Sequence, residues 1–433
     1  MTRLFGLVEQ IAGRVTTEGS RKARVLPGAL AAMVTIAMLG VYGSAGLALT
    51  DTTALAAHPR PSPSPTPTPS STSTPTPSQS GGVWTVISSP NQGTSNNQLL
   101  GVSPISSSDL WSVGYYNAGL TANSLRTLAE HWDGSGWSVV STPNVATGAA
   151  DYNWLRGIAA VSSNNVWAVG YSGNANVLGD QSLIEHWDGT QWKIVSSPNR
   201  YTSQHLYGIA AVSASDIWAV GQYFNYNPYS YGALIAHWNG TTWKKVSNPA
   251  TYPLYGVTAL AANNVWAVGG SQLLHWDGTA WSVVPSPQPP CCGNGYDLRA
   301  VAAVSASNIW AVGYAQIASG DGYTYGPLIE HWDGSSWQLG GSAAGDSLYG
   351  VTALSATGVW AVGVSGGLNF VEKWDGTQWT RQSSPNVGTS NNTFEAATAV
   401  PSTGDVWAVG EYYQPTTSYQ YLSQTLVERC QAC

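Results

Sequence analysis

One copy of a recurring pattern reads Ile217-Trp218-Ala219-Val220-Gly221 and then, after a variable segment, His237-Trp238-Asn239-Gly240-Thr241-Thr242-Trp243. The first element, Trp-Ala-Val-Gly or Trp-Ser-Val-Gly, occurs seven times, 44 to 56 residues apart, in this 433-residue chain. Self-similarity at a period near fifty residues is typical of repeat architectures. The tryptophans of this element are Trp111, Trp167, Trp218, Trp266, Trp310, Trp360 and Trp407.

Each copy has the pattern of four short strands, which in the third copy are expected at 207–212, 217–223, 233–238 and 243–246. The first strand is rich in small residues, as required where sheets converge on an axis. The second is apolar on both faces, which indicates that sheets pack on both sides of it. Asp-Gly or Asn-Gly predicts a tight hairpin between the last two strands. The sequence therefore predicts an all-β, seven-bladed β-propeller with four-stranded blades.

The seventh copy lacks its fourth strand, because the chain ends at Cys433. The missing piece is found at the other end, where Val83–Asn91 matches the fourth strand of the second copy, Trp192–Asn199. We expect this N-terminal strand to complete the last blade and close the ring. Closure hides sheet edges that would otherwise template aggregation.

The chain before the propeller has two further segments. Residues 1–57 contain a basic flank, an uncharged apolar run from Gly28 to Thr50 and a signal-peptidase-like Ala54-Leu55-Ala56. They are predicted to be a signal peptide or an uncleaved signal anchor, and the two remain open. Residues 58–82 are rich in Pro, Ser and Thr and are expected to form an extended linker. Residues 83–433 would then be a propeller that is secreted or tethered to the outer cell surface.

The order of strand, glycine turn, variable connection, strand, then Trp and Pro resembles a divergent kelch-type repeat over roughly residues 83–433. It departs from the kelch pattern at the paired glycines, since only Gly269-Gly270 has both. The Asp-Gly-x-x-Trp turns also faintly resemble the Asp-box of sialidase-like propellers, with a spacing one residue short. These resemblances imply a propeller and say little about function.

Variation between the copies is expected on one face of the disc. Two connections in each blade are short and uniform, for example 213–216, and share one face. The other two vary, for example 222–232 and 315–326, and lie on the opposite face, where binding residues tend to be found. All 21 tyrosines from Val83 onward lie in these variable connections or at the start of the innermost strand. Tyrosine with Asn, Ser and Gly makes an adaptable contact surface.

The first position of the innermost strand should surround the mouth of a central channel, and in the first copy it is Leu100. Convergent polar groups in a funnel are the default hypothesis for a ligand site. The alternative, a solvated rim without a ligand, stays open. The predicted ligand-binding residues, from this position and just before it, are Trp154, Arg156, His205, Tyr207, Tyr255, Asp297, Arg299, Tyr349 and Glu395.

Charge narrows the choice of partners. From Val83 onward the chain has ten basic and twenty acidic residues, and no basic stripe that could neutralise phosphates. Nucleic acid is therefore not an expected partner. We expect a monomer that binds a glycan or an extracellular protein, and that contacts a membrane only through an uncleaved N-terminal segment.

Catalysis and metal binding find little support in the sequence. Histidines precede the repeated tryptophan in five copies, where a repeated position serves repeat packing. A copper site like that of galactose oxidase needs two histidines together, and within the propeller only His205 lies outside the repeat. Sialidase-like chemistry needs three arginines, and the repeat places only Arg156 and Arg299 at the mouth. We expect a non-enzymatic binding module without cofactor, metal or catalytic residue. A carbohydrate-active enzyme or a structural cell-envelope protein remains the alternative.

Four cysteines are candidates for disulfides in an exported protein: Cys291, Cys292, Cys430 and Cys433. The first pair falls in a variable connection and the second near the end of the last blade, toward the opposite face. Because a disulfide requires close Cα atoms, local pairs are favoured over cross-pairing.

Overall fold

The computed structural model describes residues 82–93, 95–119, 124–287, 289, 295–319, 322–343, 345–388, 390–415 and 421–433. The predicted export segment, the linker except Gly82, and the pair Cys291-Cys292 lie outside the described residues. All helix-or-strand structure in the described ranges is β-strand. No helix long and apolar enough to cross a membrane occurs in them.

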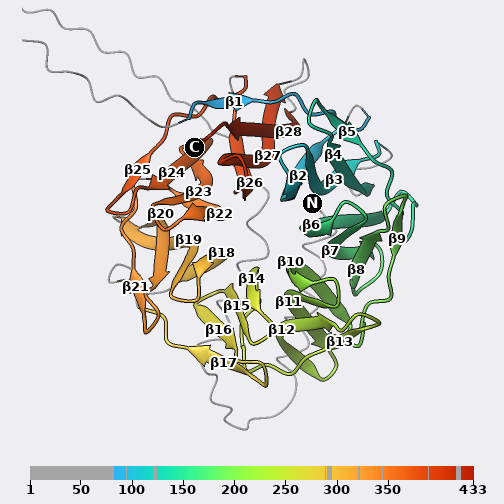
Figure 1. Cartoon of the computed structure of the whole chain (residues 1–433). Helices are drawn as coiled ribbons and strands as arrows, with labels where there is room; N and C mark the ends of the chain where they lie inside the picture. The colour runs from blue at the N-terminus through green and yellow to red at the C-terminus, as the bar shows by residue number, and fades with distance from the viewer. Residues whose placement is uncertain are drawn as a thin grey trace, which may run out of the picture. The chain divides into compact units, whose positions relative to one another are not determined.

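Seven antiparallel sheets of four strands each surround a common axis (Figure 1). Six blades are formed by consecutive strands, with the first strand nearest the axis. The seven-bladed β-propeller predicted from the repeat is therefore confirmed. In chain order the strands of the first four blades are β2 (Asn97–Ser106), β3 (Asp109–Asn117), β4 (Leu125–Trp132), β5 (Trp137–Val139); β6 (Asp151–Ser162), β7 (Asn165–Asn174), β8 (Gln181–Trp187), β9 (Trp192–Ile194); β10 (Ser203–Ser213), β11 (Asp216–Tyr226), β12 (Tyr229–Trp238), β13 (Trp243–Lys245); β14 (Gly256–Ala261), β15 (Asn264–Gly269), β16 (Gln272–Trp276) and β17 (Trp281–Val284).

The remaining blades follow the same plan, except that the last one takes its outer strand from the N-terminal end of the domain. Their strands are β18 (Tyr296–Ser305), β19 (Asn308–Ser319), β20 (Gly322–Trp332), β21 (Trp337–Leu339); β22 (Ser347–Ser355), β23 (Gly358–Ser365), β24 (Leu368–Trp374), β25 (Trp379–Arg381); and β26 (Asn392–Val400), β27 (Asp405–Pro415), β28 (Tyr421–Cys430) and β1 (Trp84–Val86).

Closure by the N-terminal strand is confirmed. β1 pairs antiparallel with β28, with Trp84 opposite Cys430. The Trp84 side chain is 3% exposed. Its ring lies 5.8 Å from that of Trp360 and 6.3 Å from that of Phe394. The strand therefore supplies both a sheet edge and a core residue to the last blade.

The two sequence elements of the repeat meet across every blade boundary. Trp218 in β11 packs 4.9 Å from Trp276 and 5.4 Å from Trp281, which belong to the following blade. The same contacts join each second-strand tryptophan to the next blade around the ring. A single copy cannot bury these faces alone, which explains why the pattern must repeat.

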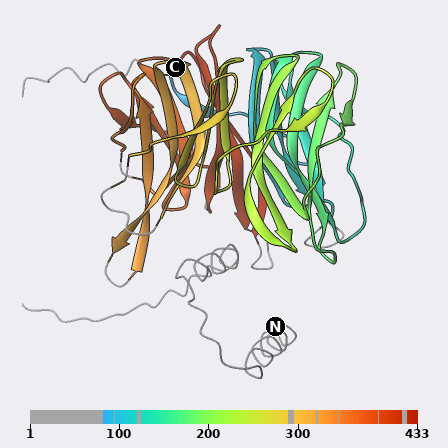
Figure 2. The same cartoon turned by 90° about the horizontal axis from the view of Figure 1, so that it is seen from below.

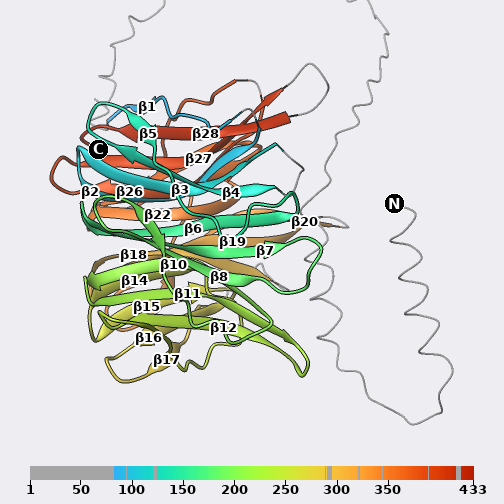
Figure 3. The same ribbon diagram turned by 90° about the vertical axis from the view of Figure 1, so that its right-hand side faces the viewer.

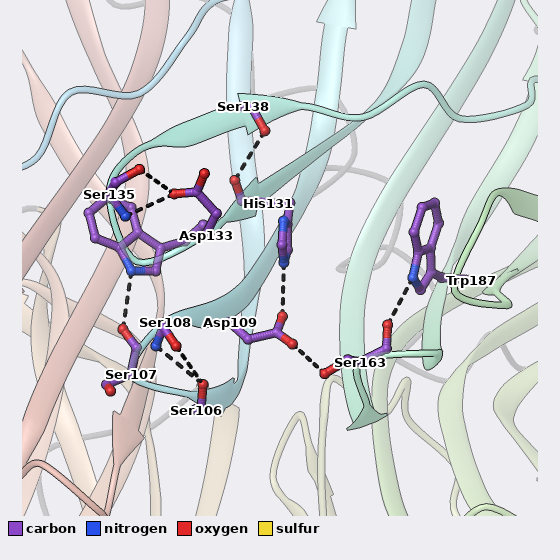
Figure 4. A network of polar contacts seen from close by, with 11 residues as sticks. Ser106, Ser107, Ser108, Asp109, His131, Asp133, Ser135, Ser138, Ser163 and Trp187 are labelled. Carbon is purple, nitrogen blue, oxygen red and sulfur yellow. Dashed lines mark hydrogen bonds and ion pairs between the residues drawn. The ribbon is translucent and has the colours of Figure 1, made fainter.

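The repeated histidines have a packing role. His131 lies 4.5 Å from the ring of Trp111, and its Nε2 is 2.8 Å from Asp109 (Figure 4). Asp109 also accepts a hydrogen bond from Ser163 of the next blade. His186, His237, His275 and His331 bond an Asp or Asn at the same position. In the last two blades Lys373 and Arg429 take the place over the tryptophan.

Buried glutamates join neighbouring blades at four boundaries, and we call them the inter-blade glutamates: Glu130, Glu330, Glu372 and Glu428. Each accepts a hydrogen bond from a serine of the preceding blade; the Ser89–Glu130 distance is 2.6 Å. Burial raises the pKa to about 8 for Glu130 and Glu428 and to about 7 for Glu330 and Glu372. Glu185 occupies the same position in the second blade. Neither of its carboxyl oxygens has a hydrogen-bond partner in the described part of the chain.

The variable connections are shorter than predicted, because much of their length is strand. The segment 222–232 was expected to be a loop, but β11 and β12 stay paired as far as Tyr226 and Tyr229. The segment 315–326 likewise continues β19 and β20 as far as Ser319 and Gly322. The aromatic residues and threonine of these segments, among them Tyr223, Phe224 and Thr324, favour such extension. We call these two hairpin ends the arms, and Figures 2 and 3 show them on the same side of the ring.

Candidate ligand site around the propeller axis

Each innermost strand except β14 contains a β-bulge near its middle, and the bulged residue is one that the sequence assigned to the channel mouth. In β10 the pairing with β11 jumps from Leu206 to Gly208, so that Tyr207 is left out of the ladder. A bulge turns a side chain away from the regular alternation. Equivalent jumps occur in five other blades. Tyr255 directly precedes β14. We call these residues the axial ring: Leu100, Arg156, Tyr207, Tyr255, Arg299, Tyr349 and Glu395.

The glycine of Trp-Ala-Val-Gly allows the bulge to form. A Cβ on Gly221 would overlap the carbonyl oxygen of His205, two residues before the bulged Tyr207. The six equivalent glycines face the same kind of backbone oxygen. The repeated glycine therefore lets the second strand lie close to the innermost strand just before the axial-ring position, in all seven blades.

The axial ring lies deeper than the sequence prediction placed it. Tyr207 was taken as the first residue of its strand, but β10 begins at Ser203, and β6 begins at Asp151, well before Arg156. The small-residue run marks only the second half of each innermost strand. The polar residues before it also pair with the second strand, so the innermost strands begin before the positions predicted as their first residues.

Side chains of the axial ring contact one another across blade boundaries. The Arg156 guanidinium lies 5.7 Å from the ring centre of Tyr207. Tyr207 is 5.2 Å from Tyr255, and Tyr255 is 4.2 Å from the guanidinium of Arg299. Glu395 lies close enough to both arginines for them to lower its pKa, although burial outweighs them and raises it. Tyr349 is partly buried, and Leu100 is the one apolar member.

Trp154 and His205, both predicted as ligand-binding residues, belong to a stack of four rings behind the axial ring. Tyr115 lies 4.2 Å from Trp154, Trp154 lies 5.6 Å from Tyr171, and Tyr171 lies 3.9 Å from His205. The faces of Trp154 and His205 are thus covered by other rings. Both residues also contact the axial ring: the Arg156 guanidinium lies 5.1 Å from the Trp154 ring, and His205 lies within hydrogen-bond distance of the Tyr207 hydroxyl.

Polar contacts fix His205 in this stack. Its Nε2 lies 2.6 Å from Asp180, and its Nδ1 lies 2.9 Å from the Tyr207 hydroxyl. Asp180 also accepts a hydrogen bond from Tyr152 at 2.5 Å. The His205 and Asp180 side chains are only 16% and 19% exposed. The orientation of Tyr207 is therefore held by a chain of contacts that runs from Asp180, directly before β8, to β10.

Arg299 has a built-in counter-charge. Asp297, which the sequence also predicted for this site, lies 2.9 Å from the Arg299 guanidinium. Arg299 donates a hydrogen bond of 2.7 Å to the Tyr314 hydroxyl. The Asp297 carboxylate accepts further hydrogen bonds from Gly270 and Tyr314. Burial raises the pKa of Asp297, and Arg299 opposes that rise.

A second carboxyl group lies beside Glu395. Glu411 in β27 accepts a hydrogen bond from Tyr413 at 3.2 Å, and Gln98 donates one to Glu395 at 3.3 Å. Burial, with the charge of Glu395, raises the pKa of Glu411 to about 7. The axis therefore has an acidic side in the last blade and basic groups in the second and fifth. This arrangement can bind a ligand that carries hydroxyl and charged groups.

The sequence missed Tyr115, Tyr171, Tyr314 and Glu411. All four directly follow the repeated glycine, as in Gly313-Tyr314. The residue type at that position differs between the copies, whereas the Trp-Ala-Val-Gly element before it is nearly constant. This variation could have pointed to a functional position. What could not be read was the register shift that brings this position beside the axial ring.

Six tyrosines are exposed on the side of the arms: Tyr226, Tyr229, Tyr231, Tyr252, Tyr323 and Tyr325. They belong to the arms and to the connection before β14. The uniform turns lie on the other side of the ring. In the third blade, Ala214 belongs to such a turn, and its carbonyl oxygen accepts a hydrogen bond from the indole N–H of Trp238. Two clefts lie at blade boundaries, one lined by Val195–Arg200 and one by Gln338–Ser342. Both lie at or just after the fourth strand of a blade, so they are a feature of how consecutive blades pack in the repeat.

The described cysteines form a disulfide, and the described residues form no candidate metal cluster. No group of three or more His, Cys, Asp or Glu residues that could hold a metal ion occurs in the described ranges. Cys430 and Cys433 are joined by a disulfide, with their Cα atoms 5.8 Å apart.

Comparison with known proteins gives a similarity in structure only. No protein-family model matches the chain. No curated protein matches it either. A solved structure described as YCF48 bound to D1 peptide is 14% identical, covers 80% of this chain and 96% of its own, and superposes with a TM-score of 0.49. The chain's own strand pairing, with seven sheets of four antiparallel strands, makes it a seven-bladed β-propeller.

Proposed function

We propose that this protein is an exported, non-enzymatic binding module whose ligand, a glycan or another protein, binds at the axial ring from the side of the arms. The observation that carries the proposal is the bulge shared by the innermost strands. In six of the seven blades it takes one side chain out of the ladder and brings it to the axis. Together with Tyr255, which directly precedes β14, these residues form the axial ring, and six of its seven side chains are aromatic or charged. Convergent polar groups on a rigid scaffold are characteristic of binding sites.

The tyrosines of the arms support binding on this side. Tyrosine gives a large contact area with few rotamers to immobilise, together with a hydroxyl group. Tyr229 and Tyr323 are 66% and 63% exposed, so their rings are free to contact a partner.

Export and the kelch-type ancestry of the repeat are part of the proposal. Residues 1–57 would direct export, 58–82 would act as a spacer, and 83–433 would be the binding domain. The Cys430–Cys433 disulfide favours an oxidising compartment. The Trp-Ala-Val-Gly element would correspond to the second strand of a divergent kelch repeat.

The test is a glycan array and a polysaccharide pull-down with the full chain. We expect Tyr207→Ala and Tyr349→Ala each to lose the captured ligand while the protein remains folded by circular dichroism. The matched control is Asp277→Asn on the uniform-turn side. It should keep the turn, because Asn239 holds the equivalent turn in the third blade through the same backbone contacts. Retained affinity in both tyrosine variants, with loss in the control, would show that the binding face is the other one.

A further inference from the structure

Arg156 differs from the other arginines of the propeller. Arg126 is buried and donates to four backbone carbonyls, and Arg299 and Arg429 each have an aspartate within ion-pair distance. Arg200 and Arg381 are exposed to water. Arg156 is only partly exposed, yet no described carboxylate lies within ion-pair distance of it. Its buried Nε has no acceptor among the described residues, which is also true of Arg299 and Arg429, so the missing carboxylate is what distinguishes Arg156.

A positive charge shielded from water without a counter-ion is unfavourable, and proteins rarely retain one without a use for it. The surroundings of Arg156 hold the guanidinium in place. It lies 5.1 Å from the ring of Trp154, which is itself stacked between Tyr115 and Tyr171. Tyr171 provides a hydroxyl acceptor. A guanidinium fixed in this way loses little freedom when it binds a planar anion.

We propose that Arg156 binds the carboxylate group of an acidic glycan. This inference rests on the proposed function, since it names the ligand of the same site. A guanidinium forms paired, charge-assisted hydrogen bonds with a carboxylate. Glu395 is the acidic group nearest to Arg156 in the axial ring, and burial favours its neutral form, which lessens its repulsion of an anion.

The rest of the axial ring fits a sugar better than a peptide. The phenol rings of Tyr207, Tyr255 and Tyr349 offer both an aromatic face and a hydroxyl group, which suit the two faces of a pyranose. The ring has one apolar aliphatic member, Leu100, which is 9% exposed. Peptides are usually anchored by apolar side chains in pockets, and Leu100 alone does not form one.

The experiment compares two probes by calorimetry with the full chain: an oligogalacturonate and its fully methyl-esterified form. Charge-assisted hydrogen bonds predict that the acid binds about ten- to hundredfold more tightly than the ester. Arg156→Gln should remove this preference. The control Arg200→Gln, which changes an exposed arginine, should keep it.

Two results would overturn the inference while leaving the proposed function intact. One is equal affinity for acid and ester in the unmodified protein. The other is tighter binding of a peptide with a free carboxyl terminus than of any glycan, which would make the ligand a peptide. If neither probe nor the peptide binds, and the array and the pull-down capture no glycan, the proposed function itself fails.

A measurement without ligand tests the same point. Arg156→Met removes a charge that has no carboxylate within ion-pair distance, so it should leave the urea midpoint of unfolding unchanged or raise it. Arg299→Met leaves Asp297 unpaired and should lower the midpoint. An equal fall in both variants would mean that Arg156 has a structural role, and the inference would be wrong.

Discussion

Replacement of Trp84 by alanine tests the closure of the ring. The Trp84 side chain is 3% exposed. It packs on Trp360 of the sixth blade and on Phe394 of the last blade, to which Trp84 itself belongs. Truncation of a buried tryptophan opens a cavity and costs about 3–5 kcal/mol of unfolding free energy. The edge-to-face contact with Trp360, at 5.8 Å, contributes to that loss. We therefore expect Trp84→Ala to destabilise the propeller by this amount, although it lies in a strand of only three residues.

The assay is equilibrium unfolding in urea, followed by circular dichroism, with size-exclusion chromatography to detect aggregation. Trp192→Ala is the matched variant, since it removes the equivalent tryptophan from a blade that is continuous in sequence. The two losses should agree within about 1 kcal/mol. Val83→Ala, at a side chain that is 77% exposed, should change the free energy by less than about 0.5 kcal/mol. A negligible loss for Trp84→Ala beside a large loss for Trp192→Ala would refute closure by β1.

Three further predictions concern stability. Gly221→Ala should destabilise the third blade by about 1–3 kcal/mol in urea unfolding, because its Cβ would overlap the His205 carbonyl; Gly136→Ala, where the added atom meets open space, should not. The inter-blade glutamates have raised pKa values, so their contribution to stability is complete below the unfolded pKa, near 4.5, and is lost as the pH rises through 7 to 8. Unfolding free energies measured at pH 5 and pH 7 should therefore fall with pH, and Glu330→Gln should reduce that fall by on the order of 2 kcal/mol. Burial raises the pKa of Glu185 well above its usual value, and its carboxyl has no partner in the described residues, so Glu185→Gln should stabilise the protein at pH 8; destabilisation there would argue against this.

The fold could be predicted because its causes are local and repeated. The Trp-Ala-Val-Gly strand is apolar on both faces, and the two sequence elements meet at every blade boundary, so one copy is enough to infer the rest. Closure was readable because Val83–Asn91 matches a fourth strand elsewhere in the chain. Even the residues of the axial ring were found, since they precede the small-residue run in each copy.

The local geometry of the site could not be predicted, because it depends on contacts between blades. The bulge at Tyr207 and the close approach of the His205 carbonyl to Gly221 depend on the register between the two strands, which sequence alone does not show. The stack of Tyr115 on Trp154 joins residues that are far apart in sequence. The inter-blade glutamates were seen only as part of a repeated motif, since their serine partners lie in the preceding copy.

Hydrogen–deuterium exchange of the full chain, with and without the glycan captured in the array, tests the central claim most directly. The account predicts slower exchange in the innermost strands around Arg156, Tyr207 and Arg299 when the ligand is bound, and no change in the turns at Asp188-Gly189 and Asp277-Gly278. Protection confined to those turns, with the innermost strands unaffected, would contradict it.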